Sequence, residues 1–268
     1  MSRRLAGARG LGPVGCAALT LGTLALLWLL LSTSGLVPSR VLPSPVDVTI
    51  RFASLLVDPF SGATLAGHLA ASLQRWAIGL ACAIAFGVPL GVLLAWLPPL
   101  RPAIAPLFEL IRYIPPFAWV PIAVLWFGAS TMTQALVVFI AAFPACVINA
   151  ALGVSQVDPI LLRAGRMLGA GSLRSLLRIA LPVAAPAIFT GVRIAFSNGW
   201  MALVGAELVV GKQGLGFLIS QGQINDSATT IIVGMVAIGL TGALLDAAMQ
   251  RSQRRLLPWL PQRSGAAT

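Results

Sequence analysis

The sequence predicts an all-α fold: a polytopic membrane protein with six transmembrane helices. Composition is the first of three observations behind this prediction. Hydrophobic residues make up 58% of the 268 positions, charged residues only 9%, and the mean hydropathy is +0.93. A soluble domain carries roughly 25% charged residues to cover its surface, so the outer face of this chain must meet lipid. The other two observations are long apolar segments and an uneven distribution of arginine.

Six segments are long enough to cross a bilayer core of about 30 Å, which takes about 20 helical residues. We predict these spans at about 15–33, 77–97, 104–128, 133–154, 186–206 and 230–250. An even number of spans places both termini on the same side of the membrane.

Basic residues indicate which side that is. With the termini inside, 12 of the 18 Lys and Arg residues fall in cytoplasmic segments and only Arg40, Arg51 and Lys212 in outer loops. The cytoplasmic set is Arg3, Arg4, Arg9, Arg101, Arg163, Arg166, Arg174, Arg178, Arg251, Arg254, Arg255 and Arg263. Under the positive-inside rule this bias predicts cytoplasmic termini, for a chain that we expect in a bacterial inner membrane. The net charge of +11 therefore reflects topology, and we expect no nucleic-acid partner.

The N-terminal part, residues 1–34, combines a basic tail with the first span. Arg3 and Arg4 before an apolar run resemble a twin-arginine or secretory signal. No A-x-A cleavage site lies between the apolar run and Ser39, and five more spans follow. We therefore interpret the first span as an uncleaved helix.

An outer segment at 35–65 contains a predicted helix. Ser44 can cap it, Pro45 suits its first turn, and Pro59 marks its end. Its apolar residues recur at helical spacing: Val48, Phe52, Leu55 and Leu56. Such a helix either lies along the outer membrane surface or packs as part of an outer loop, and the pattern leaves both alternatives open.

The longest cytoplasmic loop, 155–183, has the pattern helix, glycine, helix. Asp158 is a natural N-cap, and Pro159 suits the first helical position. Gly169 can end this first helix, since a positive φ costs glycine little. Ser172 then caps a second short helix that ends before Pro182. Apolar residues exposed on such a loop either bind a partner groove or fold back on the bundle.

This loop resembles the EAA loop of ABC importer permeases, in which E-A-A is followed by a glycine and then by I-x-L-P. The matching residues are Arg163, Ala164, Gly165, Gly169, Ile179, Ala180, Leu181 and Pro182. Further blocks resemble the nitrate, sulfonate, taurine and bicarbonate permease subgroup: Leu42 to Pro45, Arg112 to Trp119, Leu125 to Gly128 and Gly205 to Ile219. The resemblance implies a type I ABC importer (MetI-like) permease fold, with the permease domain at 66–250 and a basic cytoplasmic tail at 251–268.

In the family this loop is the coupling helix that binds the ATPase subunit. By resemblance, the coupling residues are Asp158, Leu162, Arg163, Ala164, Gly165, Met167, Leu168 and Gly169. Two positions depart from the pattern. Arg163 replaces the usual Glu and reverses a charge, while Gly165 replaces Ala and costs about 1 kcal/mol in helix propensity.

The resemblance also implies the partners: a cytoplasmic ABC ATPase dimer, a second permease copy and an extracytoplasmic solute-binding protein. We expect no cofactor and no catalytic site in this chain, with ATP and Mg bound by the partner. The Gly211-Lys212-Gln213 stretch lacks the residues of a phosphate-binding loop. Cys16, Cys82 and Cys146 form no metal pattern, and His68 is predicted to be an exposed residue near a span end.

Polar residues within the fifth span are candidates for the translocation path. They are Arg193, Ser197, Asn198 and Glu207. The alternative for Arg193 is a local ion pair near the inner interface. In the third span, Glu109 and Arg112 lie three residues apart and are predicted to neutralise each other. Gly87 and Gly91 form a G-x-x-x-G pattern that favours close helix packing.

The subgroup implies a small anionic solute such as a sulfonate, taurine or nitrate, although relatives also carry pyrimidine-type precursors. Two other function classes stay open at this point. A self-powered secondary transporter or channel would move solute without an ATPase. A membrane enzyme would need a clustered catalytic set, which the sequence does not contain.

Overall fold

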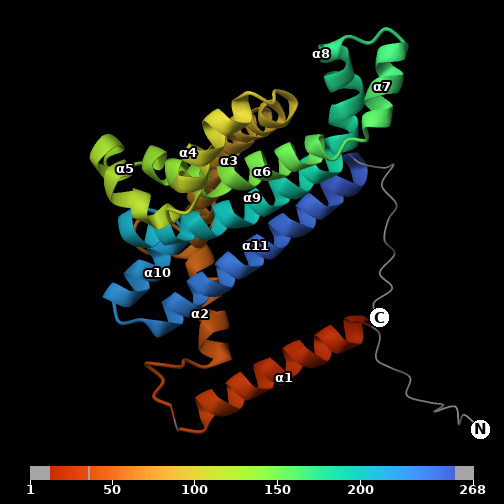
Figure 1. Cartoon of the computed structure of the whole chain (residues 1–268). Coiled ribbons are helices and arrows are strands. Elements are labelled where there is room, and N and C mark those ends of the chain that lie inside the picture. The colour runs from red at the N-terminus through yellow and green to blue at the C-terminus, as the bar shows by residue number, and fades with distance from the viewer. Residues whose placement is uncertain (1–12, 36, 257–268) are drawn as a thin grey trace, which may run out of the picture.

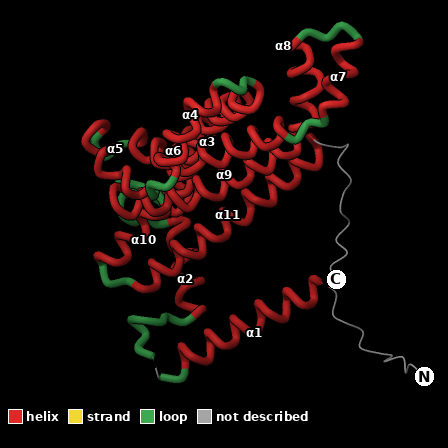
Figure 2. The backbone as a smooth tube through the Cα atoms, viewed as in Figure 1, coloured by secondary structure: helices red, strands yellow, loops and turns green. Residues whose placement is uncertain are grey.

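The computed structural model describes residues 13–35 and 37–256. Helices joined by loops make up this part of the chain, with one isolated β-bridge between Phe60 and Ala63 (Figures 1 and 2). The first half consists of α1 (Pro13–Thr33), α2 (Pro45–Val57), α3 (Leu65–Trp96), α4 (Leu100–Arg112), η1 (Pro116–Trp119), α5 (Val120–Phe127) and α6 (Thr131–Ser155). The second half consists of α7 (Pro159–Met167), α8 (Ser172–Ser175), η2 (Leu176–Ala180), α9 (Leu181–Val210), α10 (Leu215–Ile224) and α11 (Ala228–Leu256). Arg3, Arg4, Arg9 and Arg263 lie outside the described residues.

Helices α3, α6 and α9 form the centre of the bundle, with α6 between the other two. Glycines allow this close approach. A Cβ on Gly79 of α3 would lie 2.4 Å from the Ala135 carbonyl oxygen of α6, and one on Gly91 would lie 2.3 Å from the Val147 oxygen. On the other side of α6, a Cβ on Gly191 of α9 would lie 2.5 Å from Asn149 Cβ. Small residues of this kind let membrane helices pack backbone to backbone.

The G-x-x-x-G prediction is confirmed, because Gly87 also faces α6, where a Cβ would lie 2.8 Å from Cys146 Cβ.

Four helical stretches are long and apolar enough to cross a membrane, or five if a bent pair counts as one span. The four are Leu65–Trp96, Thr131–Ser155, Ser172–Ile224 and Ala228–Arg255. The apolar stretch of α1, Ala18–Thr33, is shorter. The predicted total of six is therefore not confirmed over the described residues.

The span predicted at 104–128 is not one continuous helix. Leu100–Arg112 and Pro116–Phe127 meet at a bend of 90°. The consecutive Pro115 and Pro116 explain the break, because proline lacks the N–H that continues a helix and disfavours helical backbone at the residue before it.

Helix α2 begins as predicted. The Ser44 side chain accepts a hydrogen bond from the Asp47 N–H, and Pro45 is the first residue. Val48 and Leu55 are buried in the main core, while Arg51 Nε donates to Thr230 Oγ1 of α11 across 3.3 Å. One face of α2 therefore packs on protein, while Val46, Ile50 and Val57 are exposed, so both alternatives for this segment stay open.

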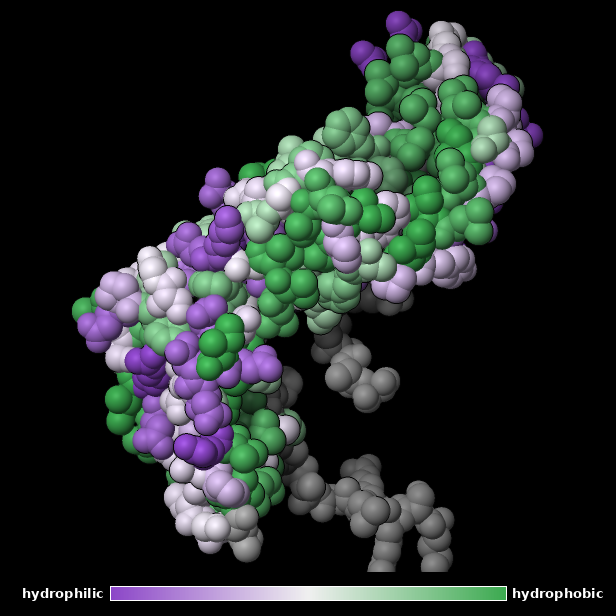
Figure 3. Space-filling model, turned by 90° about the vertical axis from the view of Figure 1, so that its left-hand side faces the viewer, coloured by the Kyte–Doolittle hydropathy of each residue, from purple (hydrophilic) through white to green (hydrophobic). Residues whose placement is uncertain are grey.

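The hairpin made by α7 and α8 projects beyond the bundle (Figure 1). The start of α1 and the end of α11 point toward the same end of the molecule, whereas α2, α10 and the start of α11 lie at the opposite end. Figure 3 shows hydrophobic residues over the middle of one face, with hydrophilic residues gathered below and along the edges of the hairpin. This distribution suits a chain whose middle lies in lipid.

Candidate coupling hairpin and translocation face

The first arm of the hairpin is α7, and its ends are built as predicted. Asp158 Oδ1 accepts a hydrogen bond from the Ile160 N–H at 2.7 Å, which satisfies a free donor of the first turn. Gly169 has φ +78° and follows the last turn, in the left-handed conformation that glycine adopts at helix ends. The Ala170 N–H then donates to the Gly165 carbonyl at 3.0 Å and closes the turn.

The second arm differs from the prediction at both ends. Gly171, not Ser172, occupies the N-cap position. Ser172 is the first helical residue, and its Oγ accepts from Trp96 Nε1 of α3 at 3.2 Å. The arm also does not end before Pro182, because α8 continues through η2 into α9. The wider π-helical turn of η2 directly before Pro182 accommodates a residue that cannot donate the next helical hydrogen bond.

Gly165 lies at the contact between the two arms. It is buried, and a Cβ there would lie 2.5 Å from Ile179 Cδ1. The sequence suggested only a cost in helix propensity at this position. The structure shows that the missing side chain also allows α7 to approach η2 closely.

The predicted docking residues separate into two groups. Met167 and Leu168 at the tip are 87% and 88% exposed. Leu162 instead turns toward the bundle, where it lines a cavity of about 650 Å³ with Trp96 and Val154. Ala164 and Arg163 are exposed, and Arg163 Nε bonds the Pro159 carbonyl in its own helix at 3.4 Å. Among the predicted docking residues, the exposed large apolar side chains are therefore Met167 and Leu168 at the tip.

The four residues predicted for the translocation path do not form one group. Arg193 pairs with Asp246 of α11, Nε to Oδ1 at 3.0 Å and Nη2 to Oδ2 at 3.1 Å, as the local alternative predicted. Ser197 bonds its own helix at the Arg193 carbonyl. Glu207 is completely buried. Asn198 lines a cavity of about 510 Å³.

That cavity, of about 510 Å³, lies between α4, α6, α9 and the α4–α5 break. Its lining is Phe108, Ile111, Arg112, Ile114, Pro116, Phe117, Phe139, Ile140, Ala141, Phe143, Pro144, Asn198, Met201 and Ala202. A second cavity, of about 500 Å³, shares Phe108 and Arg112 with it and extends to Arg101 and Ser155. The third cavity, next to Leu162, shares Ser155. The three hollows thus follow one another from the break to the base of the hairpin.

Comparison with known proteins decides the family. The model of the binding-protein-dependent transport system inner membrane component matches residues 87–261. The taurine transport system permease protein TauC of Escherichia coli is 36% identical over 245 residues, which cover 90% of this chain and 89% of that protein. The chain belongs to the binding-protein-dependent transport permeases. It is the permease subunit of an ABC importer, as the loop resemblance implied.

Other relatives of the permease are named for different solutes. The nitrate import permease protein NrtB of Leptolyngbya laminosa is 35% identical over 219 residues, covering 80% of this chain and 78% of its own. The aliphatic sulfonates transport permease protein SsuC of Bacillus subtilis, named as putative, is 28% identical over 233 residues, or 87% and 83% of the two chains. A solved structure of the MetNI methionine ABC transporter matches with a TM-score of 0.62 at 20% identity, covering 69% of this chain and 92% of that one. This likeness shows the fold.

The permease also contains a buried polar network that the sequence did not reveal. Arg75 Nη1 donates to Glu207 Oε1 at 2.9 Å, and Ser72 Oγ lies 2.9 Å from both carboxylate oxygens. The Gly216 N–H donates to Glu207 Oε2 at 3.0 Å. The carboxylate therefore joins α3 to the start of α10. The spacing of Ser72 and Arg75 on one face of α3 was the available signal.

The prediction that His68 is exposed is wrong. It is completely buried, its Nδ1 accepts from the Gly214 N–H at 3.1 Å, and its Nε2 lies 3.0 Å from the Phe60 carbonyl oxygen. An Nδ1 that accepts places the proton on Nε2, which donates to Phe60. Gly214 has φ +133°, and a Cβ there would lie 2.2 Å from Glu207 Oε1. The segment around Lys212 is thus a turn built on Glu207 and His68, with Lys212 itself exposed.

Proposed function

We propose that the permease forms the pathway for a small anion, such as a sulfonate, taurine or nitrate, delivered by an extracytoplasmic binding protein. A separate cytoplasmic ATPase dimer holds ATP and Mg and drives transport, so this chain hydrolyses nothing. The relatives TauC, NrtB and SsuC are named for taurine, nitrate and aliphatic sulfonates, and these names support a small anion as the solute. The observation that carries the proposal is the hairpin tip.

The tip suits a partner groove for a physical reason. Met167 and Leu168 are almost fully exposed at the end of a hairpin that projects from the bundle, and large apolar side chains in water favour burial against a partner. The fold-back alternative applies to Leu162, which faces its own bundle. Arg163 lies exposed on the same short helix, so the partner groove on this side would carry an acidic residue.

The basic end of the molecule would face the cytoplasm, with the chain in a bacterial inner membrane. Arg163, Arg166, Arg174 and Arg178 belong to the hairpin, and Arg251, Arg254 and Arg255 to the end of α11 that points the same way. A second permease copy would close the translocation face, because the cavity between α4, α6 and α9 is lined by Met201, which is 74% exposed in the isolated chain. Both chain termini would then be cytoplasmic.

The test is uptake into proteoliposomes of labelled taurine, methanesulfonate and nitrate. We expect uptake of at least one of them only when the permease is combined with its ATPase, its binding protein and ATP. Uptake by the purified permease alone, driven by an ion gradient, would instead establish the secondary-transporter alternative.

A further inference from the structure

Arg112 occupies a special place in the chain. It is the last residue of α4, immediately before the 90° break that interrupts the predicted third span. Broken helices in transporters occur where the backbone borders a cavity or a binding site. An ionisable residue at such a position is rare and usually pairs with a protein group or borders a solute route.

Arg75, Arg112 and Arg193 lie at or within the spans predicted from the sequence, and two of these three have a carboxylate partner. Arg75 pairs with Glu207 at 2.9 Å, and Arg193 pairs with Asp246 at 3.0 Å. Among the described residues, Arg112 has no carboxylate oxygen within 4.0 Å, and the expected pair with Glu109 does not form, so that prediction is wrong.

The side chain of Arg112 has two contacts that hold it in place without neutralising it. Its Nη2 donates to Tyr113 Oη at 3.0 Å, and its guanidinium carbon lies 4.7 Å from the centre of the Tyr113 ring. A phenol and its ring face orient a cation but leave its charge available. Arg112 thus keeps four further N–H donors and a full positive charge.

The surroundings suit a small oxyanion. The first cavity is walled by aromatic and aliphatic side chains, and its polar side chains are Arg112 and Asn198. Arg112 is exposed at the edge of this cavity in the isolated chain. Once lipid or a second permease copy covers this face, the apolar walls would weaken screening and strengthen an attraction between opposite charges relative to water. The planar guanidinium matches two oxygens of a sulfonate, carboxylate or nitrate at once.

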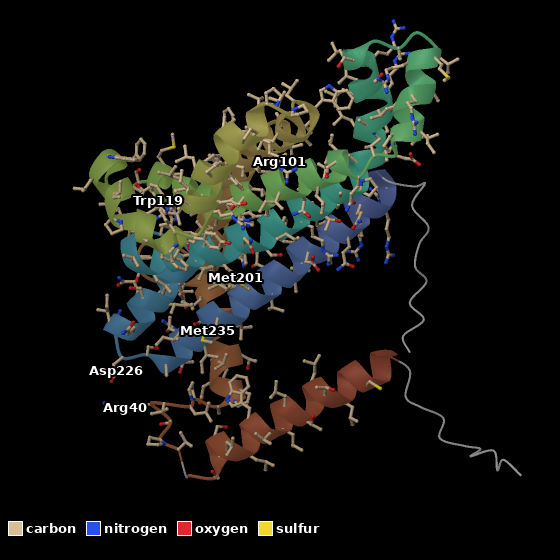
Figure 4. The ribbon with its side chains drawn as sticks, in the orientation of Figure 1. Arg40, Arg101, Trp119, Met201, Asp226 and Met235 are labelled. Atoms are coloured by element: carbon tan, nitrogen blue, oxygen red, sulfur yellow. The ribbon has the colours of Figure 1, made fainter. Side chains whose placement is uncertain are left out.

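Arg112 also lies at a junction, because it borders both the first and the second cavity. Figure 4 places Arg101, at the far side of the second cavity, toward the hairpin, and Trp119 toward the other side of the α4–α5 layer. Phe108 and Arg112 line both cavities and therefore lie where the two adjoin.

We propose that Arg112 is the anion-binding residue of the translocation path, holding a small oxyanion with the Asn198 amide beside it. This deepens the proposed function and rests on it for the identity of the natural solute. Met201, which lines the same cavity and is 74% exposed in the isolated chain, provides a reporter position.

The test measures charge selectivity at Met201 in the assembled importer, reconstituted in neutral-lipid vesicles. Met201→Cys is introduced after Cys16, Cys82 and Cys146 are replaced by alanine. The modification rate of the new thiol is measured with an anionic reagent, sulfonatoethyl methanethiosulfonate, and with its cationic trimethylammonium counterpart. We expect the anionic-to-cationic rate ratio to fall roughly tenfold in Arg112→Gln, since one nearby unit charge changes both rates in opposite directions.

The matched control is Arg40→Gln, which also removes one positive charge. Arg40 is exposed on the outer side, 4.0 Å from Asp226, and does not line the cavity (Figure 4). The control should leave the anionic-to-cationic rate ratio unchanged. Arg112→Lys keeps the positive charge and should therefore retain most of the ratio seen with Arg112.

Two results would overturn the proposal. One is an equal ratio with and without Arg112, which means that a lipid phosphate or a carboxylate of the second copy already neutralises it. The other is protection of the Met201→Cys thiol from both reagents in every nucleotide state, which means that no solute reaches the cavity. Neither result depends on which solute the importer carries, so the proposed function is tested separately by ATP-driven uptake.

Discussion

Arg75 of α3 and Glu207 of α9 form an ion pair inside the bundle, with 2.9 Å between Nη1 and Oε1 and side-chain exposures of 10% and 0%. The guanidinium also donates to the Gln213 carbonyl. The carboxylate accepts from Ser72 and from the Gly216 N–H. The pair therefore fixes the turn that connects α9 to α10 against α3.

Removing one partner of this ion pair should lower the free energy of unfolding more than removing both charges. Arg75→Leu leaves a buried carboxylate without its cation, and we expect it to lower the free energy of unfolding by about 3–5 kcal/mol. Combining it with Glu207→Gln should recover part of this loss. Thermal unfolding of the purified permease in detergent measures this recovery of stability. A double variant as unstable as Arg75→Leu would contradict the prediction.

Gly214→Ala should destabilise the same turn. Its φ of +133° is unfavourable for any residue with a Cβ, and that Cβ would lie 2.2 Å from Glu207 Oε1. We expect a loss on the order of 1–3 kcal/mol or more in the free energy of unfolding, measured by thermal unfolding in detergent. Gly239→Ala in α11 is the matched control, because no atom lies within 4 Å of its Cβ position, and it should be neutral or slightly stabilising.

Gly165→Ala, which restores the residue typical of the EAA loop, should not stabilise the hairpin by itself. The gain in helix propensity of about 1 kcal/mol is opposed by the 2.5 Å contact of the new Cβ with Ile179 Cδ1. Shortening Ile179 to Val should relieve the contact. We therefore expect Gly165→Ala/Ile179→Val to melt at a higher temperature than Gly165→Ala, and the opposite order would show that Ile179 moves aside freely.

Polar substitution at the hairpin tip should uncouple ATP hydrolysis from transport. Met167→Ser and Leu168→Ser change exposed side chains, so the permease should still fold and insert, while binding-protein-stimulated ATPase activity falls several-fold. Val57→Ser, at a 78% exposed position on α2, is the control. It should change neither the folding and insertion of the permease nor the stimulated ATPase activity. Leu162→Ser should instead lower thermal stability, since Leu162 lines the cavity beside Trp96. Normal stimulation in both tip variants would count against the docking role.

The sequence was most informative where local chemistry decides the structure. The Asp158 cap, the Pro45 start of α2 and the positive φ of Gly169 were all predicted from residue type. Each of these features depends on a few neighbouring residues, and tertiary packing did not override it. The G-x-x-x-G contact of α3 with α6 is a tertiary contact, but the spacing of two glycines indicated it.

The errors came from contacts distant in sequence. His68 is 146 residues from Gly214, and Arg75 is 132 residues from Glu207. Composition could not show that these side chains meet, so His68 looked exposed and Glu207 looked like a pathway residue. The break after Arg112 is different, because Pro115-Pro116 signalled it, yet the apolar run on both sides led to a single predicted span.

Site-specific photocrosslinking from the hairpin tip tests the central claim most directly. A benzophenone amino acid is placed at Leu168, or at Val57 as the control, in the complete importer in membranes. We predict an adduct between position 168 and the ATPase subunit, with none from position 57. An importer that transports its solute normally yet gives no ATPase adduct from position 168 would contradict the claim that the partner binds this tip.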